Sequence, residues 1–396
     1  MPPAPTPPDG GHAPGASPVP SLYVHIPFCE TKCSYCDFFS LPGGRKGREP
    51  EAYLAALDRE LALRAPAGFA PETVFVGGGT PTVLSPGEIR RLGEILRERA
   101  DLSRCTEFTV EANPGTLDVE RIDALRDAGA NRVSVGVQSF DDRILRSVGR
   151  IHDGAQARAA VADLIAAGFP RVSADILFAI PGQGKDTFAR DLEEAIALGT
   201  THLSCYALLY EEGTTMLARE RRGLVRREDE DVEREMLLDA RGRLAGAGFR
   251  AYEISNFARP GEECRHNLVY WRNRDYLGVG VSSASYLDGE RASNVRDLRA
   301  YLERIESGTD ALAERERLDP AARLGETVML GLRLDEGVRL SDLAARTGLD
   351  AEAVCGTAVR RLADAGLLEF DGDCFRLTDA GIPVADGVAA EFLAVA

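Results

Sequence analysis

Two spacings of apolar residues alternate along the chain from residue 22 to about residue 207. The short runs hold apolar and β-branched residues over five to seven consecutive positions, which is typical of strands. The longer runs between them repeat apolar residues every three or four positions, which is typical of helices with one buried face. The predicted strands are LYVHI (22–26), TVFVG (73–77), EFTVE (107–111), RVSVGV (132–137), RVSADIL (171–177) and HLSCYAL (202–208). The clearest predicted helices are EAYLAALDRELALR (51–64), PGEIRRLGEILRERA (86–100) and GAQARAAVADLIAAG (154–168).

This alternation of strands and helices predicts an α/β fold with a parallel sheet and right-handed crossovers. Six such units are too few to close an eight-stranded barrel, so we expect a partial (β/α)6 barrel. In parallel barrels the functional side chains gather at the C-terminal ends of the strands. We therefore expect the chemistry of this chain at that edge.

Two further regions follow the predicted barrel. The first combines a charged helix (228–248) with YEISNFA (252–258) and HNLVYW (266–271). The second reads as short helices followed by a hairpin around Asp371–Gly372, an α+β arrangement typical of a winged-helix-like module. We predict four segments: a disordered tail (1–20), the partial barrel (21–208), a barrel extension (209–319) and a C-terminal winged-helix-like domain (320–396).

Composition describes a globular protein and excludes several partners. The 396 residues are 44% hydrophobic and 28% charged, which is ordinary for a chain of two or more domains. A net charge of −16 argues against nucleic acid as a partner, and the C-terminal segment has seven Arg against thirteen Asp and Glu. The Pro-, Gly- and Ala-rich start is no signal peptide, and no apolar run reaches the 18 or so residues of a membrane span. We expect a cytoplasmic protein.

Three of the eight cysteines lie close together at the end of the first predicted strand. Cys29, Cys33 and Cys36 form a C-x3-C-x2-C triad, whereas the other five are scattered and are expected to be buried small apolar groups. Three thiolates can bind three irons of a [4Fe–4S] cluster and leave the fourth iron free for a small molecule. The alternative is a zinc site, which normally needs four protein ligands. The nearby candidates for a fourth ligand, His25 and Asp37, do not lie at a usual spacing, so the triad favours the cluster.

Other chemically distinctive residues also fall at the predicted strand ends. Gly77–Thr80 follow the second strand, Glu111 ends the third, Gln138 follows the fourth, and Asp175 lies toward the end of the fifth. Each has a structural alternative: a tight turn for the glycines, helix capping for the glutamate, and a turn residue for the glutamine. An ion pair with Arg150 is the alternative for the aspartate. Their shared position at one edge of the barrel favours a common site.

The motifs YVHIPFC, GGGTPT, EANP and SVGVQSF together resemble those of the radical S-adenosylmethionine (SAM) superfamily, and within it the anaerobic coproporphyrinogen III oxidase-like family. The resemblance covers about residues 21–315. It implies that the amino and carboxylate groups of SAM bind the open iron, and that electron transfer releases a 5′-deoxyadenosyl radical. It also implies that Glu111 holds the SAM ammonium and that the glycine loop contacts the methionine part. The SAM-binding residues it implies are Tyr23, Tyr35, Gly78, Gly79, Thr80, Glu111, Gln138, Arg150 and Asp175.

Two features separate the branches of this family. The oxidase branch carries a fourth cysteine two residues after the third, where this chain has Phe38. The HemW-type heme chaperone branch lacks that cysteine and carries H-N-x-x-Y-W, which His266–Trp271 match in full. An imidazole beside aromatic residues suits an axial heme ligand, so His266 is the predicted heme ligand.

The chaperone branch implies a protein of porphyrin metabolism that binds heme and transfers it to acceptor proteins, respiratory hemoproteins among them. Its implied cofactors are a [4Fe–4S] cluster, SAM and heme, and we expect a monomer or homodimer. No residue is assigned a catalytic role, and coproporphyrinogen III oxidase activity is not expected. Two alternatives stay open: a true oxidase that decarboxylates propionate side chains, and an iron–sulfur protein with neither heme nor radical chemistry.

Overall fold

The computed structural model describes residues 19–43 and 50–393. The predicted disordered tail, residues 1–20, lies outside the described residues except for its last two positions.

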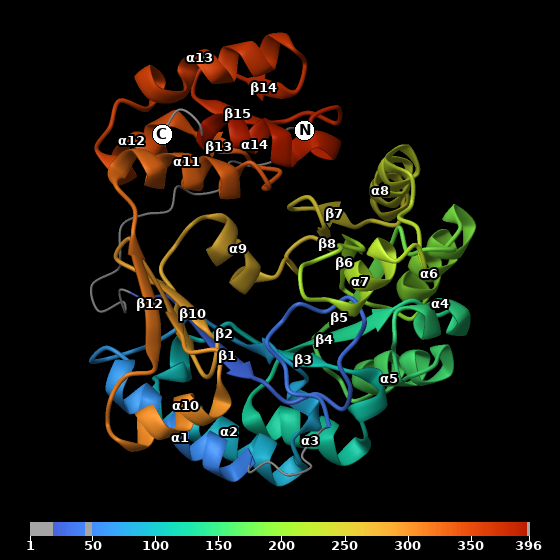
Figure 1. Ribbon diagram of the computed structural model, residues 1–396, viewed down its shortest axis with the longest axis vertical. Helices are drawn as coiled ribbons and strands as arrows, with labels where there is room; N and C mark the ends of the chain where they lie inside the picture. Colours follow the sequence, from blue (N-terminus) through green and yellow to red (C-terminus); the bar gives the residue numbers. More distant parts are fainter. Residues whose placement is uncertain (1–18, 44–49, 394–396) are drawn as a thin grey trace.

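The centre of the molecule is a nine-stranded sheet in the order β7-β8-β6-β5-β4-β3-β2-β1-β9 (Figure 1). Its first six strands pair in parallel in chain order, and they match the six predicted strands to within one residue at each end. The strands are β1 Ser21–Ile26, β2 Thr73–Gly78, β3 Glu107–Ala112, β4 Arg132–Gln138, β5 Arg171–Phe178, β6 His202–Ala207, β7 Arg250–Ala251, β8 Asn256–Ala258 and β9 Leu277–Val279. The predicted α/β partial barrel is confirmed. Its two ends were not predicted: β8 runs antiparallel to β6, and β9 pairs in parallel with β1.

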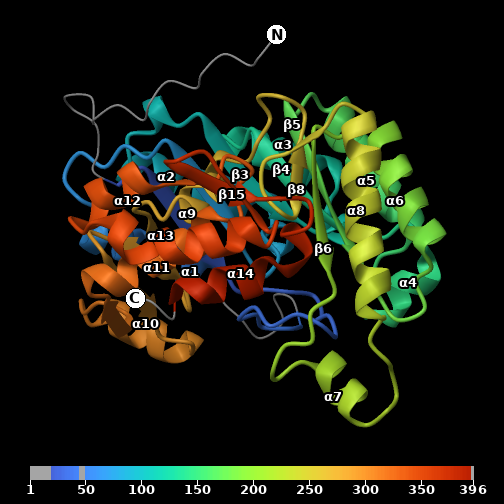
Figure 2. The same ribbon diagram turned by 90° about the horizontal axis from the view of Figure 1, so that it is seen from above.

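Helices cover the outer face of this sheet, as the crossovers of parallel strands require (Figures 1 and 2). They are α1 Pro50–Arg64, α2 Pro86–Arg99, α3 Val119–Ala128, α4 Asp142–Ser147, α5 Gly154–Ala166, α6 Lys185–Ala197 and α8 Glu230–Gly246. Local signals set several of their ends. Ser85 with Glu88 and Asp153 with Gln156 form capping boxes at the starts of α2 and α5. Gly129 ends α3 at a φ of 105°, which a side chain would make costly.

The two faces of each barrel strand carry different side chains. On β4, Val133, Val135 and Val137 are fully buried in the main hydrophobic core. The alternating positions, Ser134 and Gly136 among them, line a central cavity instead. This period of two places apolar residues against the helices and small polar residues inside the barrel.

The rest of the chain packs around the barrel at more than one place (Figure 1). It contains α7 Thr215–Arg221, α9 Arg265–Trp271, α10 Leu298–Glu306, and a second sheet of β10 Ala284–Leu287, β11 Glu290–Asn294 and β12 Leu312–Arg317. The C-terminal elements are α11 Pro320–Gly331, α12 Leu340–Thr347, α13 Ala351–Asp364 and α14 Ala385–Leu393, with a sheet of β13 Val338–Arg339, β14 Leu368–Phe370 and β15 Cys374–Leu377. These C-terminal elements enclose a hydrophobic core of their own, between Leu324 and Phe392. The hairpin predicted around Asp371–Gly372 is formed by β14 and β15.

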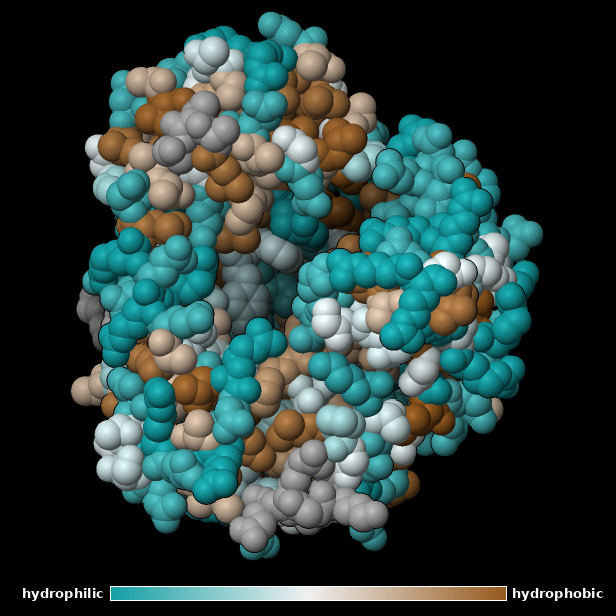
Figure 3. Space-filling view, viewed as in Figure 1, coloured by the Kyte–Doolittle hydropathy of each residue, from teal (hydrophilic) through white to brown (hydrophobic). Residues whose placement is uncertain are grey.

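No helix in the described part of the chain is both long enough and apolar enough to span a bilayer. The face shown in Figure 3 is mostly polar and is hollowed at its centre.

Candidate functional site

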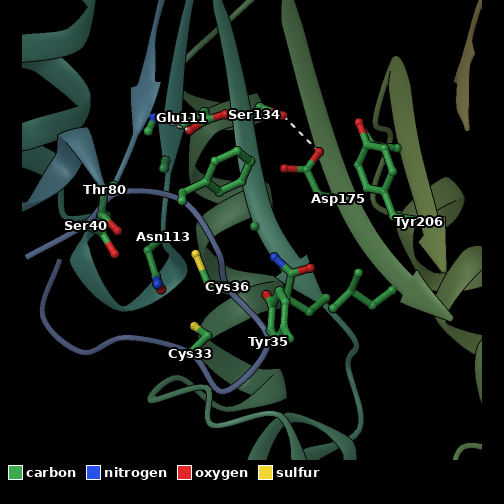
Figure 4. A pocket seen from close by; sticks show the side chains of 18 of the residues that line it. Cys33, Tyr35, Cys36, Ser40, Thr80, Glu111, Asn113, Ser134, Asp175 and Tyr206 are labelled. Atoms are coloured by element: carbon green, nitrogen blue, oxygen red, sulfur yellow. Dashed lines mark hydrogen bonds between the residues drawn. The ribbon is translucent and has the colours of Figure 1, made fainter. Parts of the chain in front are cut away.

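A cavity of about 530 Å³ lies inside the barrel and opens at the C-terminal ends of its strands. This volume is in the range of small-molecule sites. Figure 4 shows side chains from the loop after β1 and from several strands pointing into it. The cavity is lined by these residues from the predicted set: Cys29, Cys33, Tyr35, Cys36, Gly78, Gly79, Thr80, Glu111, Gln138, Arg150 and Asp175. The structure therefore brings together eleven of the thirteen predicted site residues and leaves out Tyr23 and His266.

The three cysteines lie on the loop that follows β1. The backbone N–H of Cys29 donates to the carbonyl of Leu41 (3.1 Å), and the N–H of Ser34 donates to that of Val148 (3.1 Å), so the loop is fixed at both ends. Burial raises the pKa of the Cys36 thiol to about 11, and the neighbouring sulfurs of Cys33 and Cys29 add to the increase. Bound iron would remove this penalty, because a coordinating thiol is deprotonated outright.

The arrangement of these thiols fits a cluster better than a single metal ion. Among the described residues, no three His, Cys, Asp or Glu side chains converge on one ion position. Zinc needs its sulfur ligands at about 2.3 Å, which requires such convergence. A [4Fe–4S] cluster binds each thiolate to a different iron, so three separated sulfurs on one loop suit it.

The glycines after β2 allow this strand end to pack against the cysteine loop. A Cβ on Gly79 would lie 2.7 Å from the carbonyl oxygens of Ile26 and Phe28, and Gly78 has a φ of 102°. The N–H of Gly78 donates to a carboxylate oxygen of Glu111 (3.1 Å). The loop therefore supplies close backbone contact to the cavity wall, which side chains here would block.

Two half-buried carboxylates face the cavity from β3 and β5. Burial raises the pKa of Glu111 to about 7, and the charge of Asp175 adds to the increase. Burial likewise raises the pKa of Asp175 to about 6, against the hydrogen bonds it accepts from Ser204 and Ser134. Neither carboxylate has an ion-pair partner in the described part of the chain, so each would be stabilised by a cationic ligand.

Arg150 and Gln138 complete the predicted set on the β4 side. Arg150 donates to the sulfur of Cys33 (3.4 Å) and to the carbonyl of Gly136 (2.6 Å), while its buried Nε has no hydrogen-bond partner. Among the described side chains, no ion pair joins Arg150 to Asp175. The structure therefore lacks the ion pair that was the structural alternative for these two residues. Gln138 has a φ of 67° at an irregularity in the pairing of β4 with β5. A residue held there against its backbone preference is typical of functional sites.

Tyr23 does not line the cavity, although the sequence placed it there. Its hydroxyl bonds to Nδ1 of His25 (3.1 Å) and its ring stacks on Phe75. His25 in turn bonds through Nε2 to the carbonyl of Phe39 (2.9 Å), which links β1 to the cysteine loop. Tyr23 belongs to the wall behind the cavity.

His266 offers no free nitrogen in this structure. It is 0% exposed on α9, with Nδ1 bonded to the hydroxyl of Thr73 (2.8 Å) and Nε2 to that of Tyr270 (2.9 Å). Its ring stacks on Phe75, and burial lowers its pKa to about 3. The geometry therefore gives no support to the prediction that His266 binds heme iron directly, because coordination would first have to break one of these bonds.

The HNLVYW helix instead closes the inner end of the cavity. Its neighbour Cys264 and its own Asn267 line the same cavity as Glu111. Glu107, at the start of β3, accepts the N–H groups of Arg265 and His266 at 3.0 Å each. The helix is thus anchored to the barrel floor by a strand far away in the sequence.

Sequence reasoning missed several polar side chains of the cavity wall. They are Thr109, Asn113, Arg132, Ser134, Ser173, His202, Ser204 and Tyr206. Most occupy every second position of β3 to β6, between apolar residues that face the helices. The signal was therefore available in the period-two alternation of these strands.

Comparisons with known proteins agree with this site. The family model described as radical SAM superfamily matches residues 23–195, and the HemN C-terminal domain model matches residues 318–384. A heme chaperone HemW of Mycobacterium tuberculosis is 39% identical over 389 residues, which cover 96% of this chain and 97% of that protein. A heme chaperone HemW of Lactococcus lactis is 36% identical and covers 94% of this chain and 97% of its own length.

One solved structure is similar over nearly the whole chain. It is the coproporphyrinogen III oxidase (HemN) of Escherichia coli, a radical SAM enzyme, with a TM-score of 0.82 and 26% identity. The match covers 95% of this chain and 91% of the oxidase.

Proposed function

Because the chain belongs to the radical SAM family whose members are named heme chaperone HemW, we propose that it binds heme and passes it to acceptor proteins. In this proposal Cys29, Cys33 and Cys36 carry a [4Fe–4S] cluster, and SAM binds beside it. The observation that carries the proposal is that these thiols line the same cavity as two carboxylates without an ion pair among the described residues. The similarity to a heme chaperone extends over 96% of the chain.

The cavity's own residues suit SAM. Glu111, held by the N–H of Gly78, would accept a hydrogen bond from the amino group of SAM, and Asp175 offers a second carboxylate two strands away in the same sheet. Arg150 would keep its contact with Cys33 and place positive charge near the cluster's thiolates. When bound, the cluster and SAM supply one-electron chemistry at this site. The protein's part is to hold both groups side by side in this cavity.

Oxidation of coproporphyrinogen III is the second candidate, and the similarity to the oxidase structure favours it. Phe38 argues against it, because it replaces the fourth cysteine of the oxidase motif. The more similar relatives are named as chaperones, which argues in the same direction. The acceptor proteins proposed here are hemoproteins, with those of respiration as the first group to test.

An anaerobic titration of the cluster-loaded protein tests the proposal. Adding heme should produce a saturable shift of the Soret band at about one heme per chain. With reduced cluster, SAM and coproporphyrinogen III, the same preparation should form no protoporphyrinogen. Multiple-turnover product formation would establish the oxidase, and the absence of heme binding would exclude the chaperone.

A further inference from the structure

The cavity of about 530 Å³ has two ends of different character, an inner wall of thiols and carboxylates and a mouth that carries exposed side chains. The inner wall, with its cysteines and carboxylates, suits SAM. Heme, a large planar and mostly apolar ring with two propionates, is therefore left with the mouth of the cavity.

That mouth carries an unusual group of exposed apolar side chains. Phe38 is 63% exposed, Leu209 62% and Tyr206 40%, and all three line the cavity. Single exposed apolar residues are common on proteins, but a group at the entrance of a pocket marks a binding surface. We call these three residues the apolar lip.

The lip is built from two segments that adjoin. Phe38 lies on the cysteine loop, whereas Tyr206 and Leu209 lie at the end of β6 and just beyond it. The N–H of Met216, on α7, donates to the carbonyl of Ser34 on the cysteine loop (2.7 Å), so the chain that follows the second segment is bonded to the first. Both segments line the same cavity as the cluster-binding thiols, so a ligand held by the lip would lie at the entrance of the cluster site.

One exposed cation accompanies the lip. Among the described basic side chains that line the cavity, only Lys32 is exposed. It forms no ion pair within the described part of the chain. Its Nζ donates to the carbonyl of Phe38 (3.3 Å), so its charge lies beside the apolar surface. A propionate could pair with it, whereas Asp37 and Glu211 on the same mouth would turn the other propionate toward solvent.

The histidines of the described chain are not available at this mouth. His25, His152, His202 and His266 are each at most 4% exposed, and each has a ring nitrogen in a hydrogen bond. With no histidine of the described chain free to bind iron at the mouth, contact with the faces of the ring would supply the affinity instead. That arrangement suits a protein that must release its cargo.

We propose that the apolar lip of Phe38, Tyr206 and Leu209 seats heme by contact with the porphyrin ring, with Lys32 pairing with a propionate. This inference rests on the proposed function, because it locates the cargo of the proposed chaperone. It places heme at the mouth of the SAM cavity and gives the HNLVYW helix a structural role on the floor.

The test compares full-length, cluster-loaded protein carrying Phe38→Ala, Leu209→Ala or both with a matched control, Leu63→Ala. Leu63 lies on α1, is 52% exposed and does not line the cavity. Hemin and metal-free protoporphyrin IX are titrated anaerobically in the presence of SAM, with iron and sulfide content confirming the cluster. Each lip substitution should weaken both ligands by about tenfold, as expected for loss of one aromatic or aliphatic contact, and the control should bind normally.

Metal-free protoporphyrin IX should bind the wild-type protein within about tenfold of hemin, because the ring provides the affinity. Lys32→Gln should weaken both ligands a few-fold at low salt, and the difference should fade at high salt. Unchanged heme affinity in the double variant would contradict the heme site proposed at the lip, and so would a wild-type protein that does not bind metal-free protoporphyrin IX. Either result would leave the proposed chaperone function intact. A wild type that binds no heme would overturn the proposed function itself.

Discussion

Glu111 and Asp175 are carboxylates of the cavity wall that form no ion pair among the described residues. Burial raises the pKa of Glu111 to about 7 and that of Asp175 to about 6, so the protein bears a cost for keeping either ionised. A cationic ligand bound beside these groups would stabilise their ionised forms. SAM, with its positively charged sulfonium, is such a ligand, and Glu111 is already oriented by the N–H of Gly78.

Replacing Glu111 by Gln should weaken SAM binding by at least about tenfold, because a charge-assisted hydrogen bond contributes about 1.5–3 kcal/mol. The cluster should remain, because Glu111 is not one of its proposed ligands. Calorimetry under anaerobic conditions measures the affinity. Glu94→Gln, on the exposed face of α2, serves as the control and should bind SAM as the wild type does. Equal affinity in all three proteins would mean that SAM binds elsewhere.

SAM affinity should also depend on pH in a direction fixed by the same carboxylate. With a pKa of about 7, Glu111 in the free protein is mostly protonated below that pH and mostly ionised above it. The ionised form is the stronger acceptor for the amino group of SAM, so affinity should fall as the pH is lowered from 8 to 6. Glu111→Gln should flatten this part of the profile. A wild-type profile that rises toward acid pH would contradict the assignment.

At the scale of elements, the barrel strands were predictable and the closing elements were not. Strands β1 to β6 carry continuous apolar faces that a short window of sequence reveals. β9 is a three-residue strand, LGV, and only its pairing with β1 makes it one. The role of His266 depended on contacts with Thr73 and Phe75, some 190 residues earlier, which no local pattern reports.

The cysteine loop should account for the whole cluster. Cys33→Ala should lose most of the iron and sulfide after anaerobic reconstitution, because a thiolate ligand is removed from the triad. Cys374→Ala should keep a full complement, since that thiol lies on β15 in the C-terminal module. The measurement is the iron and sulfide content per chain of both variants. A full cluster in Cys33→Ala, or a lost one in Cys374→Ala, would refute the triad.

Helix α9 should respond to substitution as a structural element. His266→Ala removes two buried hydrogen bonds and a ring stacked on Phe75, which should destabilise the fold by about 2–4 kcal/mol and lower the Tm. The folded fraction should keep the wild-type heme Soret band. A changed Soret band with an unchanged Tm would instead restore His266 as a heme ligand. The exposed Arg265 of the same helix provides a control through Arg265→Ala.

At the scale of the whole molecule, the C-terminal module contacts the rest of the chain beside the helix that closes the cavity floor. Arg333, just after α11, lies over the ring of Trp271 at 4.6 Å and within 3.7 Å of the buried Glu253. Arg272 at the end of α9 pairs with Glu336 (2.9 Å). The HNLVYW helix therefore contacts both the barrel and the C-terminal module. Sequence reasoning identified the motif but could not place it, because its partners come from both cores.

The central claim is that this protein hands heme to another protein. The most direct measurement is anaerobic transfer from the heme-loaded, cluster-loaded chain to an apo-hemoprotein, followed by the absorbance of the acceptor. Transfer should be faster than from heme bound to an unrelated carrier such as albumin. It should also need direct contact between the two proteins, so a dialysis membrane between donor and acceptor should abolish the advantage. Retention of heme by the chain in the presence of acceptors, together with turnover of coproporphyrinogen III, would contradict the account.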